Sequence, residues 1–142
     1  MNKALLAIIF AVAGAPAWAQ MTPEGLWNSI DDRTGQPKAE IRIAAKPEGL
    51  AGTVERSLQP SKEPLCTQCT GERKNQPKLG MEIIRGAKKV QDKDVWEEGK
   101  ILDPENGREY TLRLTPIEDG KKLEVRGYFG PFGRTQTWVR VQ

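Results

Sequence analysis

Apolar and polar residues alternate in short runs along most of this 142-residue chain, and turn-forming residues interrupt the alternation about every ten positions. Such spacing is typical of all-β sandwiches and barrels. A series of eight antiparallel strands closes readily into a small barrel without free edges. The pattern therefore predicts an all-β fold, a small closed up-and-down antiparallel barrel of about eight strands. The expected strands are residues 26–30, 39–45, 50–58, 81–84, 95–102, 108–117, 122–128 and 134–141.

Residues 59–78 interrupt this rhythm, because three prolines stand among polar residues there, and we expect a long loop. The short run after the loop is ambiguous. Its apolar residues fit a strand over 81–84, but apolar residues also continue to Val90 at helical spacing. Gly86 disfavours a helix, so we predict a strand.

The first nineteen residues have the pattern of a secretory signal peptide. Lys3 precedes an unbroken apolar run that ends at Ala13, and the small residues Ala17 and Ala19 form a cleavage site. We expect cleavage after Ala19 and a mature chain, residues 20–142, that folds as a single barrel domain. The apolar run is about half the roughly 20 residues that a membrane-spanning helix needs. We therefore predict a protein that is not transmembrane and is periplasmic or secreted.

The composition excludes several classes of protein. The chain has no His, so Ser-His-Asp and Cys-His catalytic arrangements cannot form, and a metal site would lack its commonest ligand. We predict no bound metal and no cofactor. The formal net charge is +3, and basic and acidic residues are interspersed. Nucleic-acid binding typically needs a basic stripe and a recognisable reading module, so we predict no nucleic-acid partner. The oligomeric state stays open.

Cys66 and Cys69 form a Cys-x-x-Cys motif inside the predicted loop. In an exported protein the oxidising surroundings favour a disulfide, and we predict a structural one that stiffens the loop. A redox-active pair is an alternative, but such pairs stand at a helix start in a βαβ setting, whereas this one stands among prolines in an all-β chain. A zinc site would lack two of its four ligands.

Two motifs at opposite ends of the mature chain predict how the barrel closes. Gly25-Leu26-Trp27 begins the first strand, and the last strand carries Arg134, Trp138 and Arg140. The first and last strands of a closed barrel are neighbours, so an indole can plug one end while a guanidinium stacks on it. Such a cation–π contact contributes about 0.5–2 kcal/mol. We expect these residues to form the closure: Gly25, Trp27, Arg134, Trp138 and Arg140.

Several of these motifs resemble one bacterial family, catalogued as domain of unknown function 2147. The motifs are the Gly25-Leu26-Trp27 start, the turn at 31–35, the stretch 96–110, and above all residues 123–128 with 133–138. The likeness extends over almost all of the mature chain. It implies an exported, lipocalin-like barrel with no established activity.

The Gly-x-Trp start is also similar to the general lipocalin signature. In lipocalins that Trp packs at the closed end of the barrel against an Arg from the region of the last strand. The resemblance implies that Trp27 contacts Arg140, with Arg134 as the alternative. The chain is shorter than typical lipocalins and shows no clear C-terminal helix.

Five aromatic residues are candidates for lining a ligand cavity or its mouth, because ligand pockets are mostly apolar with a few polar groups. These are Trp96, Tyr110, Tyr128, Phe129 and Phe132. Packing in the core is the alternative for each of them. Three glycines and a proline within 126–128 and 130–133 surround aromatic residues between the last two strands. They predict either a tight barrel corner or a mouth loop whose Tyr128, Phe129 and Phe132 gate entry.

Four carboxylates are candidates for an acid and base pair of a hydrolase, since glycoside chemistry needs only two such groups. They are Asp31, Asp32, Asp103 and Glu105. Each stands in a turn pattern, where such side chains bind their own backbone, and we predict turn formation.

The favoured function is therefore a non-enzymatic, exported binding module for a small apolar or amphipathic ligand or a fragment of the cell envelope. The first alternative is an interaction or structural protein of the envelope whose barrel is completely filled. The second is an enzyme, either a thiol-disulfide oxidoreductase using Cys66 and Cys69 or a carboxylate hydrolase.

Overall fold

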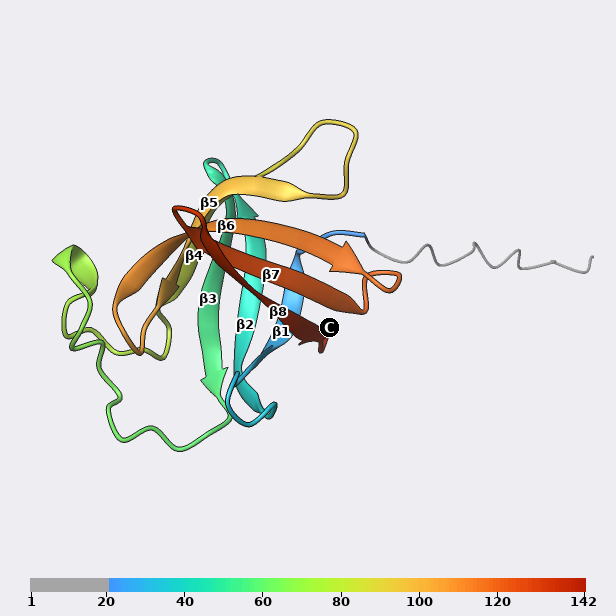
Figure 1. Ribbon diagram of the computed structural model, residues 1–142. Helices are drawn as coiled ribbons and strands as arrows, with labels where there is room; N and C mark the ends of the chain where they lie inside the picture. Colours follow the sequence, from blue (N-terminus) through green and yellow to red (C-terminus); the bar gives the residue numbers. More distant parts are fainter. Residues whose placement is uncertain (1–20) are drawn as a thin grey trace, which may run out of the picture.

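The computed structural model describes residues 21–142 and shows one closed barrel of antiparallel strands (Figure 1). Each strand pairs with the next along the chain, and the last returns to the first. The predicted all-β up-and-down barrel is confirmed, while the predicted signal peptide lies outside the described residues. The strands are β1 (Gly25–Ile30), β2 (Pro37–Lys46), β3 (Gly49–Ser57), β4 (Glu82–Lys89), β5 (Trp96–Asp103), β6 (Arg108–Ile117), β7 (Lys122–Phe129) and β8 (Phe132–Arg140).

The ambiguous run after the long loop is an extended strand, so the helical alternative is wrong. β4 pairs with β3 on one side and β5 on the other. It continues beyond the predicted end because Gly86 bends the strand without ending it. Gly86 has a φ of 73°, a conformation that glycine adopts at little cost and that is typical of strand irregularities.

Alternate residues of each strand fill the barrel interior, because successive side chains of a strand point to opposite faces. The large inward side chains are almost completely buried. Burial of each aliphatic side chain contributes about 1.5–3 kcal/mol, so this interior supplies most of the driving force for folding. The most buried of these residues are Trp27, Ile41, Ile43, Ile84, Leu112, Leu114 and Leu123.

The two ends of the barrel carry different connections. The turns after β2, β4 and β6 form one end of the barrel, which we call the closed end. The two ends of the described chain also meet there. Leu26 and Gln142 join them, since the Leu26 N–H donates to the Gln142 carbonyl at 3.1 Å. The turns after β1, β5 and β7 and the long connection after β3 form the other end, which we call the open end.

The seam between β1 and β8 is short and lies at the closed end. Its strand pairing consists of Trp27 with Arg140 and Asn28 with Val139. Farther toward the open end β8 pairs only with β7 as far as Phe132, and the first pairing with β1 lies back at Val139. The barrel is therefore tightest where the two ends of the described residues meet.

The long connection after β3 is fastened by a disulfide between Cys66 and Cys69 and contains a 3-10 turn, η1 (Gly71–Arg73). Ile83 and Leu102 alternate with inward residues and so face outward, yet both are buried. The connection covers them, because Arg73 donates to the Glu82 carbonyl at 3.1 Å. It therefore packs on the outer wall of β4 and β5.

Among residues 21–142, no helix is both long and apolar enough to cross a membrane.

Candidate functional site

Trp27 and Arg140 form a compact cluster at the closed end. The indole is completely buried, and the guanidinium carbon lies 4.2 Å from the centroid of its ring. The Trp27 Nε1–H donates to the Pro23 carbonyl at 2.7 Å. Gly25 has a φ of 134°, and a Cβ at this position would lie 2.5 Å from Arg140 Nη1. The cluster therefore requires glycine at position 25.

The Arg140 guanidinium also joins segments from both ends of the described chain. Burial lowers the pKa of Arg140, but a guanidinium remains charged at neutral pH. All of its hydrogen bonds go to main-chain oxygen atoms, so the group is used by the structure and is not available to a ligand. The acceptors are the carbonyls of Thr22, Glu24 and Gly120 and a main-chain oxygen of Gln142.

Arg134 and Trp138, the other residues of the predicted closure, lie elsewhere on β8. Arg134 stands near the open end and forms a 2.9 Å ion pair with Asp32, so it does not contact Trp27. Trp138 is buried opposite Leu123 on β7. Its Nε1–H donates to Gln136 Oε1 at 2.9 Å. The closure thus uses one arginine of β8, and Trp138 belongs to the core.

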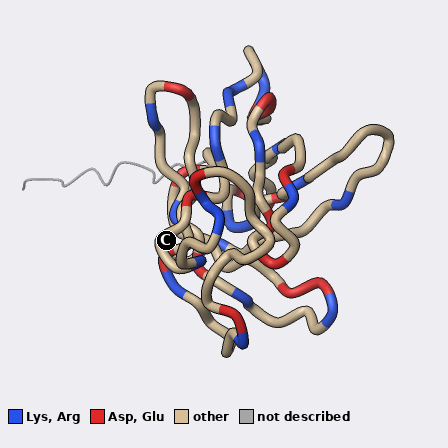
Figure 2. The backbone as a smooth tube through the Cα atoms, turned by 90° about the vertical axis from the view of Figure 1, so that its left-hand side faces the viewer, with Lys and Arg blue, Asp and Glu red and all other residues tan. Residues whose placement is uncertain are grey.

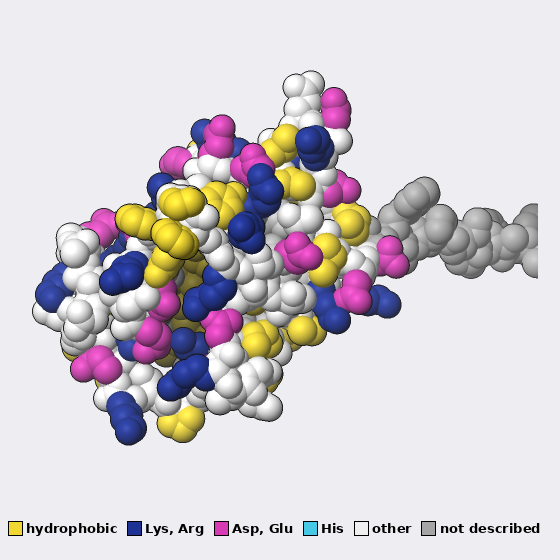
Figure 3. All heavy atoms as spheres, viewed as in Figure 1, with side chains coloured by type: hydrophobic (Ala, Val, Ile, Leu, Met, Phe, Trp, Pro, Cys, Tyr) yellow, Lys and Arg dark blue, Asp and Glu magenta, His cyan; other side chains and the backbone are white. Residues whose placement is uncertain are grey.

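The interior near the open end is less completely filled than the closed end. Ile101 and Tyr110 are paired on β5 and β6, and both are half-buried. Gly127 faces them: a Cβ there would lie 3.3 Å from the Tyr110 Cβ and 3.6 Å from Ile101 Cγ2. Figure 3 shows a hollow with a hydrophobic floor on this side of the molecule, rimmed by charged side chains. An apolar surface is therefore open to solvent here.

Phe129 and Phe132 stand at the tip of the β7–β8 hairpin, beside this hollow. They are 72% and 77% exposed and form the last cross-strand pair before the turn. Tyr128 is half-buried, and the Arg126 guanidinium carbon lies 5.6 Å from the centroid of its ring. The predicted corner is thus a tight hairpin that carries exposed aromatic side chains.

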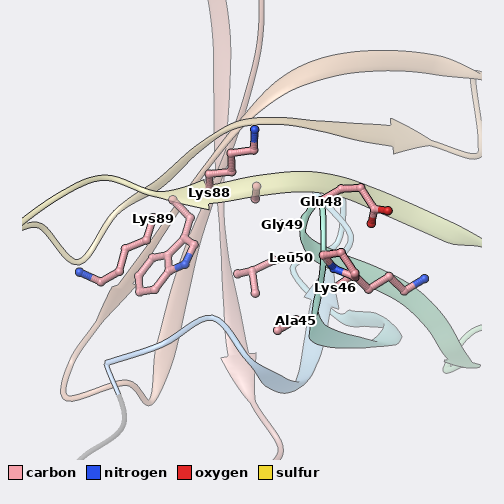
Figure 4. A pocket seen from close by; sticks show the side chains of 10 residues that line it. Ala45, Lys46, Glu48, Gly49, Leu50, Lys88 and Lys89 are labelled. Carbon is pink, nitrogen blue, oxygen red and sulfur yellow. The ribbon is translucent and has the colours of Figure 1, made fainter.

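Trp96 lies at the closed end, about 13 Å along the strands from Tyr110, since its partner Leu114 is four residues from that tyrosine on β6. It borders a surface pocket of about 310 Å³ between the β2–β3 turn and β4. Figure 4 shows Leu50 pointing toward this side of the pocket and Lys89 beside the indole. The Lys89 Nζ lies 5.6 Å from the ring centroid. The five candidate aromatic residues are therefore divided between the two ends.

The cysteine pair is buried, with Cys66 at 0% and Cys69 at 2% exposure. The sulfur of Cys66 lies 3.3 Å from the Pro104 carbonyl oxygen. Gly107 lets the β5–β6 turn approach this close, because a Cβ there would overlap the Gln68 carbonyl. Reactive cysteines are partly exposed and lie in electropositive surroundings, whereas buried ones are inert. The surroundings of this disulfide are those of a structural bond.

The candidate carboxylates are used in turns and in surface ion pairs. Asp31 Oδ1 accepts the Arg33 N–H at 2.8 Å, and this hydrogen bond lowers the Asp31 pKa. Asp103 Oδ1 accepts the Glu105 N–H at 2.9 Å. Glu105 itself pairs with Lys78 at 3.3 Å. Within residues 21–142 no group of three or more His, Cys, Asp or Glu side chains has the arrangement of a metal site.

Basic and acidic residues are interspersed along the backbone in Figure 2, and neither sign forms a continuous stripe. Within the described chain, twelve contacts between basic and acidic side chains fall within ion-pair distance. Many of these charges are therefore neutralised locally on the surface of the protein.

This architecture defines the class of protein: a small lipocalin-like barrel. A similar solved structure is that of protein HP1028 from the human pathogen Helicobacter pylori, which is described as belonging to the lipocalin family. The TM-score is 0.71 at 17% sequence identity, over 84% of this chain and 82% of that one. At this identity the likeness shows a shared fold.

The chain belongs to the bacterial family described as "uncharacterized protein conserved in bacteria (DUF2147)", whose model matches residues 25–140. The resemblance seen in the sequence is thus confirmed. No curated protein matches the chain.

Ile101 of the open end was not among the sequence candidates. Its position follows from strand register, because it pairs with Tyr110 on β6. The alternation of residues along each strand indicates which side chains point inward. Only the pairing between strands shows which inward side chains meet.

Proposed function

We propose that this protein is an exported, non-enzymatic binding protein that holds one small apolar or amphipathic molecule at the open end of its barrel. The observation that carries the proposal is the contrast inside the barrel. Inward residues at the closed end, such as Leu114, are completely buried, whereas Ile101 and Tyr110 are only partly buried.

The size and chemistry of the open end suit a ligand of this kind. An eight-stranded barrel is about wide enough to hold one small ligand. Gly127 lets β7 lie close against Tyr110, since a Cβ there would lie 3.3 Å from the Tyr110 Cβ. Ile101 and Tyr110 nevertheless stay partly exposed. Polar groups lie near the floor of the hollow, since the Tyr110 hydroxyl accepts from Asn106 Nδ2 at 3.3 Å. Pockets of this composition orient an amphipathic molecule.

The test uses cis-parinaric acid, a fatty acid whose polyene tail becomes fluorescent in apolar surroundings. The wild type is titrated beside Ile101→Trp, which fills the hollow, and Lys100→Trp, which adds the same side chain at the neighbouring exposed position. We expect Ile101→Trp to weaken binding about tenfold or more and Lys100→Trp to change it by less than about twofold. Thermal unfolding of both variants checks that the barrel is intact.

A third variant separates the open end from the pocket beside Trp96. Ala45→Trp would fill that pocket, because Ala45 is an exposed residue of its lining. Loss of binding in Ala45→Trp, with Ile101→Trp unaffected, would place the ligand at the closed end and contradict the proposal. A wild type that binds no probe would favour a filled barrel that acts as an interaction protein.

Export is supported by the signal-peptide pattern of residues 1–19 and by the disulfide, which forms in oxidising compartments. The test is fractionation of bacteria that produce the full chain, followed by intact-mass measurement. We expect a periplasmic product that begins at Gln20 with Cys66 and Cys69 oxidised. A cytoplasmic product that retains residues 1–19 would contradict the proposal.

A further inference from the structure

The tip of the β7–β8 hairpin presents apolar surface to solvent in an ordered form. Phe129 and Phe132 are the most exposed large hydrophobic residues of the described chain, and they face each other across the two strands. Only Gly130 and Pro131 separate them, and Gly130 has a φ of 57°. Strand pairing thus continues to the last residue before the turn, so the backbone that carries both rings is hydrogen-bonded into the sheet. Exposed apolar patches of this kind mark interaction sites.

The charged residues of the hairpin beyond Glu124 are all basic. The chain contains no Asp or Glu after Glu124, whereas it contains Arg126, Arg134 and Arg140. Arg140 is held at the closed end, so the hairpin itself carries the other two. No carboxylate of residues 21–142 lies within ion-pair distance of Arg126. The Arg134 side chain is 67% exposed although it pairs with Asp32.

We propose that the β7–β8 hairpin docks the protein on an anionic lipid surface. Phe129 and Phe132 enter the boundary between headgroups and acyl chains, and Arg126 and Arg134 lie among the lipid phosphates. Aromatic side chains are enriched at this boundary, and anionic headgroups attract nearby arginines. Hydrophobic side chains in Figure 3 gather over this hairpin, at the edge of the hollow.

The small area of the tip favours a membrane over a protein partner. Each Phe side chain buries about 150–250 Å² when it is covered completely. Two of them supply roughly half of the 800 Å² per partner that a stable protein interface buries. Insertion of two rings into a bilayer needs no complementary surface. The tip therefore suits a lipid surface better than a second protein or a second copy of this chain.

The test is co-sedimentation of the mature protein with vesicles of phosphatidylcholine, with and without phosphatidylglycerol. We expect binding to the anionic vesicles, weakened by salt. The double variant Phe129→Ser/Phe132→Ser should lose about tenfold or more in affinity, because both rings leave the bilayer. The double variant Arg126→Gln/Arg134→Gln should lose about fivefold or more on anionic vesicles only. Leu79→Ser removes an exposed apolar side chain elsewhere, since Leu79 is 60% exposed, and should bind like the wild type.

Three outcomes would overturn the proposal. The first is that the wild type does not sediment with anionic vesicles. The second is that Leu79→Ser weakens binding as much as the double Phe variant does. The third is that the wild type binds no vesicles and forms a dimer, which the double Phe variant dissociates. Docking does not depend on the ligand at the open end. Ile101→Trp should therefore lose cis-parinaric acid but keep vesicle binding, so the two proposals can fail separately.

Discussion

Both ends of the barrel combine an aromatic side chain with an arginine, but the two pairs differ in what surrounds them. At the closed end Trp27 is completely buried, and the Arg140 guanidinium is bound by backbone carbonyls. At the open end Phe129 and Phe132 are exposed, and Arg126 lies near Tyr128 without a carboxylate partner among the described residues. An arginine whose donors are used by the backbone holds the fold. An arginine with unused donors on an exposed hairpin is available for binding.

The largest expected effect comes from truncating the aromatic residue at each end. Trp27→Ala should lower the free energy of unfolding by about 3–5 kcal/mol, because it leaves a cavity at the plugged end of the barrel. Phe132→Ala is the matched variant and should change it by less than about 0.5 kcal/mol, since its ring is mostly in solvent. Urea unfolding followed by fluorescence measures both. Equal losses in the two variants would remove the distinction between the ends.

The arginines offer a second comparison on the same strand. Arg140→Met keeps the aliphatic stem but leaves several backbone carbonyls without a donor, and should cost about 2–3 kcal/mol. Arg134→Met removes one exposed ion pair and should cost less than about 1 kcal/mol. Arg140→Lys should not restore stability, because one ammonium cannot replace a planar guanidinium that stacks on Trp27. The measurement is again urea unfolding, and full stability of Arg140→Lys would contradict the role given to the guanidinium.

Removal of the disulfide tests whether the barrel wall near the open end can open locally while the closed end keeps its stability. Cys66→Ala/Cys69→Ala should cost about 2 kcal/mol, the loop-closure contribution of so short a loop. We expect faster hydrogen exchange at the amide of Cys66 and its neighbours, which bond within the loop, and unchanged exchange at Leu26. Equal loss of protection at Leu26 would show that the disulfide supports the whole barrel.

The smallest expected effect is on stability in acid. It comes from an ion pair on the barrel wall, between the two ends. A hydrogen bond from Lys46 lowers the pKa of Glu82, with a further contribution from Arg85. Ionised Glu82 therefore contributes its full stabilisation at pH values above its ordinary pKa of 4.5. This stabilisation is lost as the pH falls through the lower pKa that Glu82 has in the folded protein. It should be below about 1 kcal/mol, because the pair is partly exposed.

Glu82→Gln should flatten the dependence of unfolding free energy on pH between neutral and acid conditions. An unchanged slope in Glu82→Gln would indicate that Glu82 contributes nothing to acid stability.

The sequence predicted the strands well and the site only in part. The alternating pattern located β2, β6 and β7, because one face of each strand is apolar and the other polar. It was weakest for β4, where Gly86 changes the alternation within the strand. Among the aromatic candidates, residue type alone could not separate Trp96 from Tyr110, because an aromatic residue at an inward position serves either as core or as pocket lining.

By itself the sequence determined the all-β fold class, since the period of two along the strands and the spacing of turns predict a series of short antiparallel strands. It also placed a Trp and two arginines on the first and last strands. The tertiary structure alone decided which arginine reaches the indole, which aromatic residues share an end, and where the disulfide connection packs. These depend on the register between neighbouring strands and on the space left by residues such as Gly25, Gly107 and Gly127. Register and space are set by contacts between residues far apart in the chain, which no local pattern contains.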